Sequence, residues 1–212
     1  MGILISTVIS FAAEGAVIAL AERRIDAEPA DEPRFPFARV GSVREAIAAK
    51  LKSEQARAMV CLAACGADLL ALDVAQERGV RTRVILPFSA QKFRNTSVID
   101  RPHAEFWGEL FDRVIAKVRA DGDLVELDRA ADDPDAYSAA NRVIVEEARR
   151  LAQGNAHSAQ PIAMIVWNGA PRGASDSTKE FADLAEASGF RVIEVPTLGD
   201  PDGNAAGMSA GS

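Results

Sequence analysis

Two turns of small residues, each lying between an apolar run and an amphipathic run, are the parts of this chain best suited to bind a ligand. The first turn covers residues 63–68 (Ala-Ala-Cys-Gly-Ala-Asp), and the second covers residues 169–178 (Gly-Ala-Pro-Arg-Gly-Ala-Ser-Asp-Ser-Thr). Small residues at a strand-to-helix turn let a ligand approach the backbone, and a helix N-terminus offers unpaired N–H groups and a partial positive charge. Two such turns in one small chain indicate a phosphorylated, nucleotide-like ligand.

The polar residues near the first turn each allow a binding role and a structural role. Asp68 opens a predicted helix, where it either caps that helix or accepts a hydrogen bond from a ribose hydroxyl or a base. Lys92 and Arg94 follow a later strand and are either ordinary surface charges or phosphate contacts. Trp167 ends a strand and is either a core residue or a stacking platform for a base.

The second turn carries the same ambiguity. Ser175, Ser177 and Thr178 either cap the helix that follows or hold a phosphate with their hydroxyls and backbone amides. Asp176 would repel a phosphate placed close to it, and Arg172 could offset that repulsion.

Alternating apolar and amphipathic segments predict the elements that position these turns. The expected strands cover residues 16–21, 57–62, 82–86, 124–127, 161–167 and 191–196. The expected helices cover 46–54 after a capping box at 42–45, 68–78, 103–119, 134–153 and 177–187, with 87–102 as a loop.

This alternation predicts an α/β fold, a three-layer Rossmann-like domain with a mainly parallel sheet of about five to seven strands. Residues 16–197 form this single domain, residues 1–15 a lead-in segment, and residues 198–212, rich in Gly, Asp, Ala and Ser, a disordered tail.

Ligands of open parallel sheets bind beyond the carboxyl ends of the strands, so the residues that follow the strands are expected to share one cleft. Because two helix N-termini would face that cleft, backbone donors and basic side chains would hold the phosphate. The expected ligand-binding residues are Arg23, Gly66, Ala67, Asp68, Pro87, Phe88, Asn168, Gly169, Arg172, Gly173, Ser177 and Thr178.

Composition narrows the classes of function. The net charge of −7 argues against a nucleic-acid partner, which would need a broad basic face. The first 20 residues lack the basic start of a signal peptide and would place Glu14 inside a membrane helix, so we expect a cytoplasmic protein without a membrane partner. Cys61 and Cys65 are expected to be reduced thiols.

No cofactor and no metal site are expected. The glycine pattern does not match G-x-G-x-x-G, and no D-x-D or H-x-x-x-H spacing marks a metal site. The two histidines, His103 and His157, have no strong nucleophile nearby in sequence, so no hydrolytic triad is visible.

Several segments together resemble the SLOG superfamily of Rossmann-like nucleotide-binding domains, which includes the LOG phosphoribohydrolases and the DprA-like proteins. The resemblance is closest to bacterial SLOG-like domains of little-known function, and it spans roughly residues 16–197. It is carried by residues 24–26 with 32–36, 63–68, 86–88 with Phe93 and 97–98, Tyr137 with Asn141, and 166–169.

Two departures limit what this resemblance implies. Relatives tend to have a Ser-Gly-His turn where this chain has Ala21, Glu22 and Arg23, so a carboxylate stands where a phosphate would approach. LOG enzymes have a catalytic glutamate where this chain has Phe181. The resemblance therefore implies nucleotide binding more strongly than phosphoribohydrolase activity.

Three hypotheses follow for the function. The first is a domain that binds or senses a nucleotide or a nucleotide-derived signal. The second is an enzyme that cleaves an N-glycosidic bond, for which Asp68 and Glu180 are the candidate carboxylates. The third is an assembly module with a vestigial pocket. The sequence does not decide whether a reaction is catalysed, or whether the chain is a monomer or a homo-oligomer.

Overall fold

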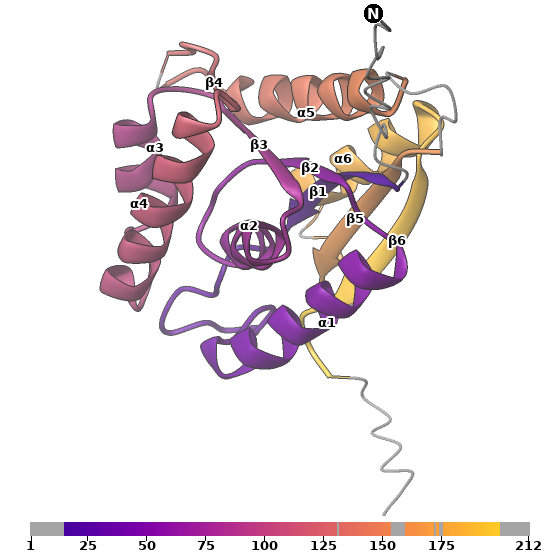
Figure 1. The fold of residues 1–212 in the computed structure, drawn as a ribbon. Coiled ribbons are helices and arrows are strands. Elements are labelled where there is room, and N and C mark those ends of the chain that lie inside the picture. The colour runs from indigo at the N-terminus through magenta and orange to yellow at the C-terminus, as the bar shows by residue number, and fades with distance from the viewer. Residues whose placement is uncertain (1–14, 131, 154–159, 172, 174–175, 200–212) are drawn as a thin grey trace, which may run out of the picture.

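The chain forms a six-stranded, all-parallel sheet with helices on both faces (Figure 1). The computed structural model describes residues 15–130, 132–153, 160–171, 173 and 176–199. The strands lie in the order β4-β3-β2-β1-β5-β6. Their bounds are β1 Val17–Glu22, β2 Ala58–Cys61, β3 Arg81–Leu86, β4 Leu124–Glu126, β5 Ile162–Trp167 and β6 Arg191–Pro196. The predicted three-layer, Rossmann-like α/β fold is confirmed.

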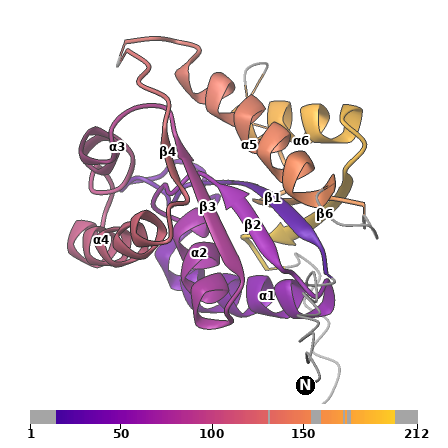
Figure 2. The same ribbon diagram turned by 45° about the horizontal axis from the view of Figure 1, so that its top comes forward.

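Two apolar clusters, one on each face of the sheet, hold the layers together. On one face, α1 (Val40–Ser53), α2 (Ala67–Glu77) and α4 (Ala104–Ala120) pack against the strands. On the other face lie α5 (Ala136–Gln153) and α6 (Ser177–Ala187), as Figure 2 shows. Because the central strands β1, β2 and β5 are covered on both faces, they read as nearly continuous apolar runs rather than alternating ones.

Helix α2 is enclosed by its neighbours over most of its length, and most of its buried residues are apolar. Its residues from Ala67 to Ala75 are all buried, and it packs against α1, α4 and the strands. Its N-terminus, which follows β2, is therefore held rigidly at the carboxyl edge of the sheet.

The sequence analysis was wrong about two segments. Helix α1 begins at Val40, directly after a 3₁₀ turn at Phe37–Arg39, so Ser42 lies inside the helix and its hydroxyl donates to the Arg39 carbonyl instead of forming a capping box. The expected loop at 87–102 contains a helix, α3 (Ala90–Ser97), which Ser89 caps by accepting from the Lys92 N–H. The polar composition of α3 hid its helical pattern.

Strand order places a crevice beside β1. This strand pairs with β2 on one side and β5 on the other, and the helices that connect the strands leave it toward opposite faces. In open parallel sheets such a switch point is where ligands bind, at the carboxyl ends of the strands.

The expectations for residues 1–14 and 200–212 lie outside the described residues. Among the helices that are described, none combines the length and the apolar character needed to cross a membrane.

Candidate functional site

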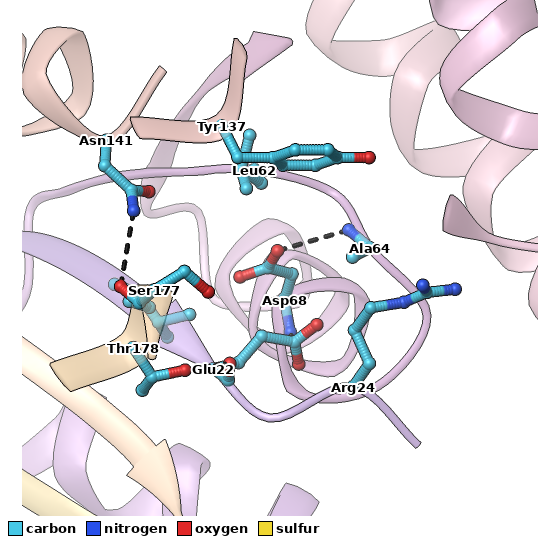
Figure 3. Close-up of a pocket in the computed structure, with 11 residues that line it drawn as sticks. Glu22, Arg24, Leu62, Ala64, Asp68, Tyr137, Asn141, Ser177 and Thr178 are labelled. Atoms are coloured by element: carbon cyan, nitrogen blue, oxygen red, sulfur yellow. Dashed lines mark hydrogen bonds between the residues drawn. The ribbon is translucent and has the colours of Figure 1, made fainter. Parts of the chain in front are cut away.

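A pocket opens at the switch point, above the carboxyl ends of β1 and β2 and beside the N-terminus of α6. Its cavity volume is about 90 Å³, which is room for roughly three water molecules at about 30 Å³ each. Figure 3 shows its lining, which comes from β1, the β2–α2 turn, α5 and α6. The lining residues are Leu20, Ala21, Glu22, Arg24, Leu62, Ala64, Asp68, Tyr137, Asn141, Ser177 and Thr178.

Two carboxylates lie next to each other at the base of this pocket (Figure 3). The backbone N–H of Asp68 donates to Oε2 of Glu22 at 2.7 Å, and the N–H of Ala64 donates to Oδ2 of Asp68 at 3.1 Å. The second oxygen of each carboxylate, Oε1 of Glu22 and Oδ1 of Asp68, is buried and accepts no hydrogen bond from any described residue. The pocket lining thus includes two buried acceptor atoms that have no donor among the described residues.

Burial disfavours the ionised form of both carboxyl groups and therefore raises their pKa values. It raises the pKa of Asp68 to about 7, although the hydrogen bond from Ala64 and the charge of Arg24 act in the opposite direction. Burial, followed by the neighbouring Asp68 charge, raises the pKa of Glu22 well above its ordinary value. A ligand that brings hydrogen-bond donors or positive charge would stabilise the ionised forms.

The opposite wall of the pocket is formed by α5 and the start of α6. Nδ2 of Asn141 donates to the Ser177 carbonyl at 3.4 Å, and this hydrogen bond joins the two helices within that wall (Figure 3). The Tyr137 hydroxyl lies 2.6 Å from the Ser97 hydroxyl, which connects α5 to α3. The Tyr137 ring and the Leu20 and Leu62 side chains give the pocket an apolar wall that could contact a planar or aliphatic group.

Both helix N-termini at this edge are already filled by carboxylates of the protein. Glu22 accepts from the first turn of α2, and Asp176 accepts from the N–H groups of Thr178 and Lys179 at 3.0 Å each. These two carboxylates occupy the donors that the sequence analysis assigned to a ligand phosphate. The expected phosphate site at the helix N-termini is therefore not supported.

Arg23, which was expected to contact a phosphate, forms its hydrogen bonds and ion pair within the protein. Its Nη1 lies 2.6 Å from Oδ2 of Asp176, and both side chains are buried. Its other nitrogen atoms donate to the Ala170 carbonyl at 2.6 Å and to Oδ1 of Asn168 at 3.4 Å. Arg23 thereby fastens the second turn to β1 and does not line the pocket.

Arg24, which the sequence analysis did not select, lines the pocket instead. Its Nη2 donates to Sγ of Cys65 at 3.4 Å and forms an ion pair with Asp100. In Figure 3 its guanidinium extends away from Asp68, on the side of Ala64.

The remaining predicted site residues are divided between the pocket and its surroundings. Asp68, Ser177 and Thr178 line the pocket, and Gly66 and Ala67 lie behind it at the start of α2. Gly66 has a φ of +129°, and a Cβ there would lie 2.9 Å from Oε2 of Glu22, so only glycine allows that carboxylate to reach α2.

The other predicted residues lie outside the pocket lining. Pro87 follows β3, and Phe88 packs edge-on against Tyr137 at 6.0 Å between ring centroids. Asn168, Gly169 and Gly173 follow β5, and Arg172 and Ser175 fall outside the described residues.

The side chains that had two possible roles take structural or surface positions. Arg94 pairs with Asp112, and Trp167 is buried in the core. Glu180 is exposed beside a separate hollow between α5 and α6, and Phe181 is fully buried. The ring of His103 stacks on Phe37 at 3.5 Å, and His157 lies outside the described residues.

Glu22 lines the pocket but was not among the predicted ligand-binding residues. In the sequence, Glu22 stood out only because it departs from the SLOG pattern. Nothing in the local sequence indicates that its carboxylate reaches α2. Comparison of the chain with protein-family models and with curated proteins finds no match. The resemblance to the SLOG superfamily stays a prediction.

Proposed function

We propose that this protein binds a nucleotide or nucleotide-derived ligand in the pocket at the carboxyl edge of the sheet. One observation carries the proposal: two buried carboxylate oxygens, from Glu22 and Asp68, lie in the pocket without a donor from the described residues. An unsatisfied buried polar group costs about 1–3 kcal/mol, and more when it is charged, so folded proteins rarely keep one without a use.

The chemistry of the pocket selects one end of such a ligand. Ribose hydroxyls and the amino groups of a base donate hydrogen bonds, which the two carboxylates and Oδ1 of Asn141 can accept. The apolar wall formed by Leu20, Leu62 and the Tyr137 ring suits the remainder of a sugar or base. Because the cavity has a volume of about 90 Å³, it takes one moiety of a nucleotide and leaves the rest at the mouth.

The proposal is tested by calorimetric titration of the whole chain with a panel of nucleosides, nucleoside monophosphates and nucleoside diphosphates. We expect saturable binding of at least one of them, and at least a tenfold change in its dissociation constant in Asp68→Asn. Glu186→Gln, an exposed position on α6, serves as the matched control and should bind like the wild type. The absence of heat with every ligand in the panel would overturn the proposal and favour an assembly module.

N-glycosidic cleavage is a second candidate, because the pocket holds two carboxylates rather than one. A glycosidic bond cleaves through an oxocarbenium-like state that a nearby carboxylate stabilises, and a second carboxyl group can transfer protons. The residues in place for this are Glu22 and Asp68, whereas Glu180 lies outside the pocket.

A chromatographic assay for released base tests this second candidate. We expect that any turnover of a nucleoside monophosphate is lost in both Glu22→Gln and Asp68→Asn and is kept in Glu180→Gln. Turnover that survives in Asp68→Asn would exclude the pocket as its source.

A further inference from the structure

The acidic character of the pocket is at odds with a phosphorylated ligand, and the structure indicates how the two can be reconciled. Glu22 accepts one N–H group of the first turn of α2, and Asp176 accepts two N–H groups of the first turn of α6. The nearby guanidinium of Arg23 is held by Asp176, and that of Arg24 by Cys65 and Asp100. Both guanidinium groups are thus already paired with a carboxylate, and the buried Nε of Arg24 has no partner among the described residues.

The two carboxylates are held in the way that metal-binding carboxylates are held. Each uses one oxygen to accept a backbone N–H, at 2.7 Å for Glu22 and 3.1 Å for Asp68, and the other oxygen of each is buried without a donor among the described residues. Hydrogen bonds of this kind orient the carboxylates that bind metals. Asp68 is 1% exposed, its Oδ1 is buried without a donor among the described residues, and its carboxylate lies beside that of Glu22 in the lining of the pocket (Figure 3).

The number and type of available atoms select the class of ion. Within the described residues, no group of three or more histidine, cysteine, aspartate or glutamate side chains could hold a metal ion. A site with thiolate or imidazole ligands, as zinc prefers, is therefore not present in that part of the chain. Mg²⁺ differs because it usually keeps several waters and is bound by one or two carboxylates together with substrate phosphates.

The size of the cavity agrees with a partly hydrated ion. A volume of about 90 Å³ admits roughly three waters at about 30 Å³ each, so an ion on the carboxylates would keep part of its water shell. Oδ1 of Asn141 and the hydroxyl of Ser177 line the same cavity and could accept hydrogen bonds from those waters.

We propose that Glu22 and Asp68 bind one divalent cation of the hard, oxygen-preferring class, Mg²⁺ or Mn²⁺, through Oε1 and Oδ1. The ion neutralises the carboxylate pair and provides the positive charge to which a ligand phosphate would bind. The role toward phosphate rests on the proposed function, whereas the ion site itself does not.

The test uses the full chain, freed of metal by chelation and dialysis and titrated with MnCl₂ at pH 8 without nucleotide. Free Mn²⁺ is measured by electron paramagnetic resonance, and MgCl₂ is then added as a competitor. We expect one saturable site from which Mg²⁺ displaces Mn²⁺. The dissociation constant should rise at least tenfold in Glu22→Gln and in Asp68→Asn and stay unchanged in Glu45→Gln, an exposed control on α1.

A variant that keeps the negative charge distinguishes a loss of Mn²⁺ binding from a loss of the folded structure. Glu22→Asp keeps the carboxylate but shortens its reach, so it should weaken Mn²⁺ binding while the unfolding midpoint in chelator shows a folded protein. Binding that is absent in the wild type, or equally strong in the wild type, Glu22→Gln and Asp68→Asn, would overturn the ion site.

A second titration, with a nucleoside and its monophosphate in the presence of Mg²⁺ or of chelator, separates this inference from the proposed function. We expect Mg²⁺ to lower the dissociation constant of the monophosphate at least tenfold. The dissociation constant of the nucleoside should stay the same or rise. Mn²⁺ binding without any nucleotide binding would keep the ion site and overturn the proposed function. Nucleoside binding without any Mn²⁺ site would keep the proposed function and overturn the ion.

Discussion

Replacement of Arg23 by methionine should destabilise the protein more than any surface substitution. The Arg23 guanidinium lies 2.6 Å from the Asp176 carboxylate, with side-chain exposures of 3% and 1%, and also donates to the Ala170 carbonyl. Removal of one partner from a buried ion pair costs about 3–5 kcal/mol, because the other charge stays buried without its counter-ion. For a domain of this size, that loss lowers the melting temperature by roughly 6–20 °C at about 2–4 °C per kcal/mol.

The assay is urea-induced unfolding, followed by far-ultraviolet circular dichroism, with Arg23→Met, Asp176→Asn and the double variant measured side by side. Asparagine keeps an oxygen that can accept the Thr178 and Lys179 N–H groups that Asp176 now caps. The double variant should therefore be more stable than Arg23→Met alone, because it no longer buries a charge that has lost its arginine.

The control is Arg150→Met, which removes an arginine that pairs with Glu147 on the exposed face of α5. It should leave the unfolding midpoint unchanged. The reasoning would be refuted if Arg23→Met cost no more than Arg150→Met, or if the losses in the two single variants simply added in the double variant.

The remaining predictions concern stability at other places in the fold. Hydrogen bonds from Arg81 lower the pKa of Asp123 below its ordinary value, so its contribution is present at neutral pH and is lost as pH falls through that lowered pKa. Asp123→Asn should cost about 2 kcal/mol at pH 7, and unfolding curves measured down to pH 3 should show the difference from wild type shrinking; a constant difference would contradict this account. Gly66→Ala should cost about 2 kcal/mol or more through backbone strain and overlap, whereas Gly41→Ala, in an open helical position, should stabilise by about 0.5–1 kcal/mol. Thermal melts compare Gly66→Ala with Gly41→Ala. Equal changes in melting temperature would show that the close contacts at Gly66 do not affect stability.

Long apolar runs explain why the sheet could be predicted from the sequence. β5 is buried along its whole length and carries the strong apolar signal that a strand covered on both faces requires. α3 was missed because its eight residues include few apolar ones, with Phe93 as the large side chain that anchors it. The start of α1 was misplaced because the 3₁₀ turn before it has no distinctive sequence pattern.

The site could be predicted only in part, for a different physical reason. Asp68 and Thr178 follow strands, so topology alone brings them to the same edge of the sheet. The use of Glu22 as a cap for α2 and of Asp176 as the partner of Arg23 depends on contacts between distant segments. Local sequence identifies the helix N-termini as attractive to anions, but it does not tell whether the anion comes from a ligand or from the chain itself.

The central position of β1 has a consequence for the synthesis of this protein. β1 through β4 leave the ribosome before β5, so the β1 edge that will pair Ile18 with Ile162 and Glu22 with Val166 stays bare while more than half of the chain is made. A bare, apolar strand edge invites pairing with other chains. The same late segments supply Asn141 and Thr178 to the pocket, so a ligand can bind only after that edge is covered. A ligand of this pocket would therefore stabilise only completed, folded molecules. It would not protect nascent chains from aggregation.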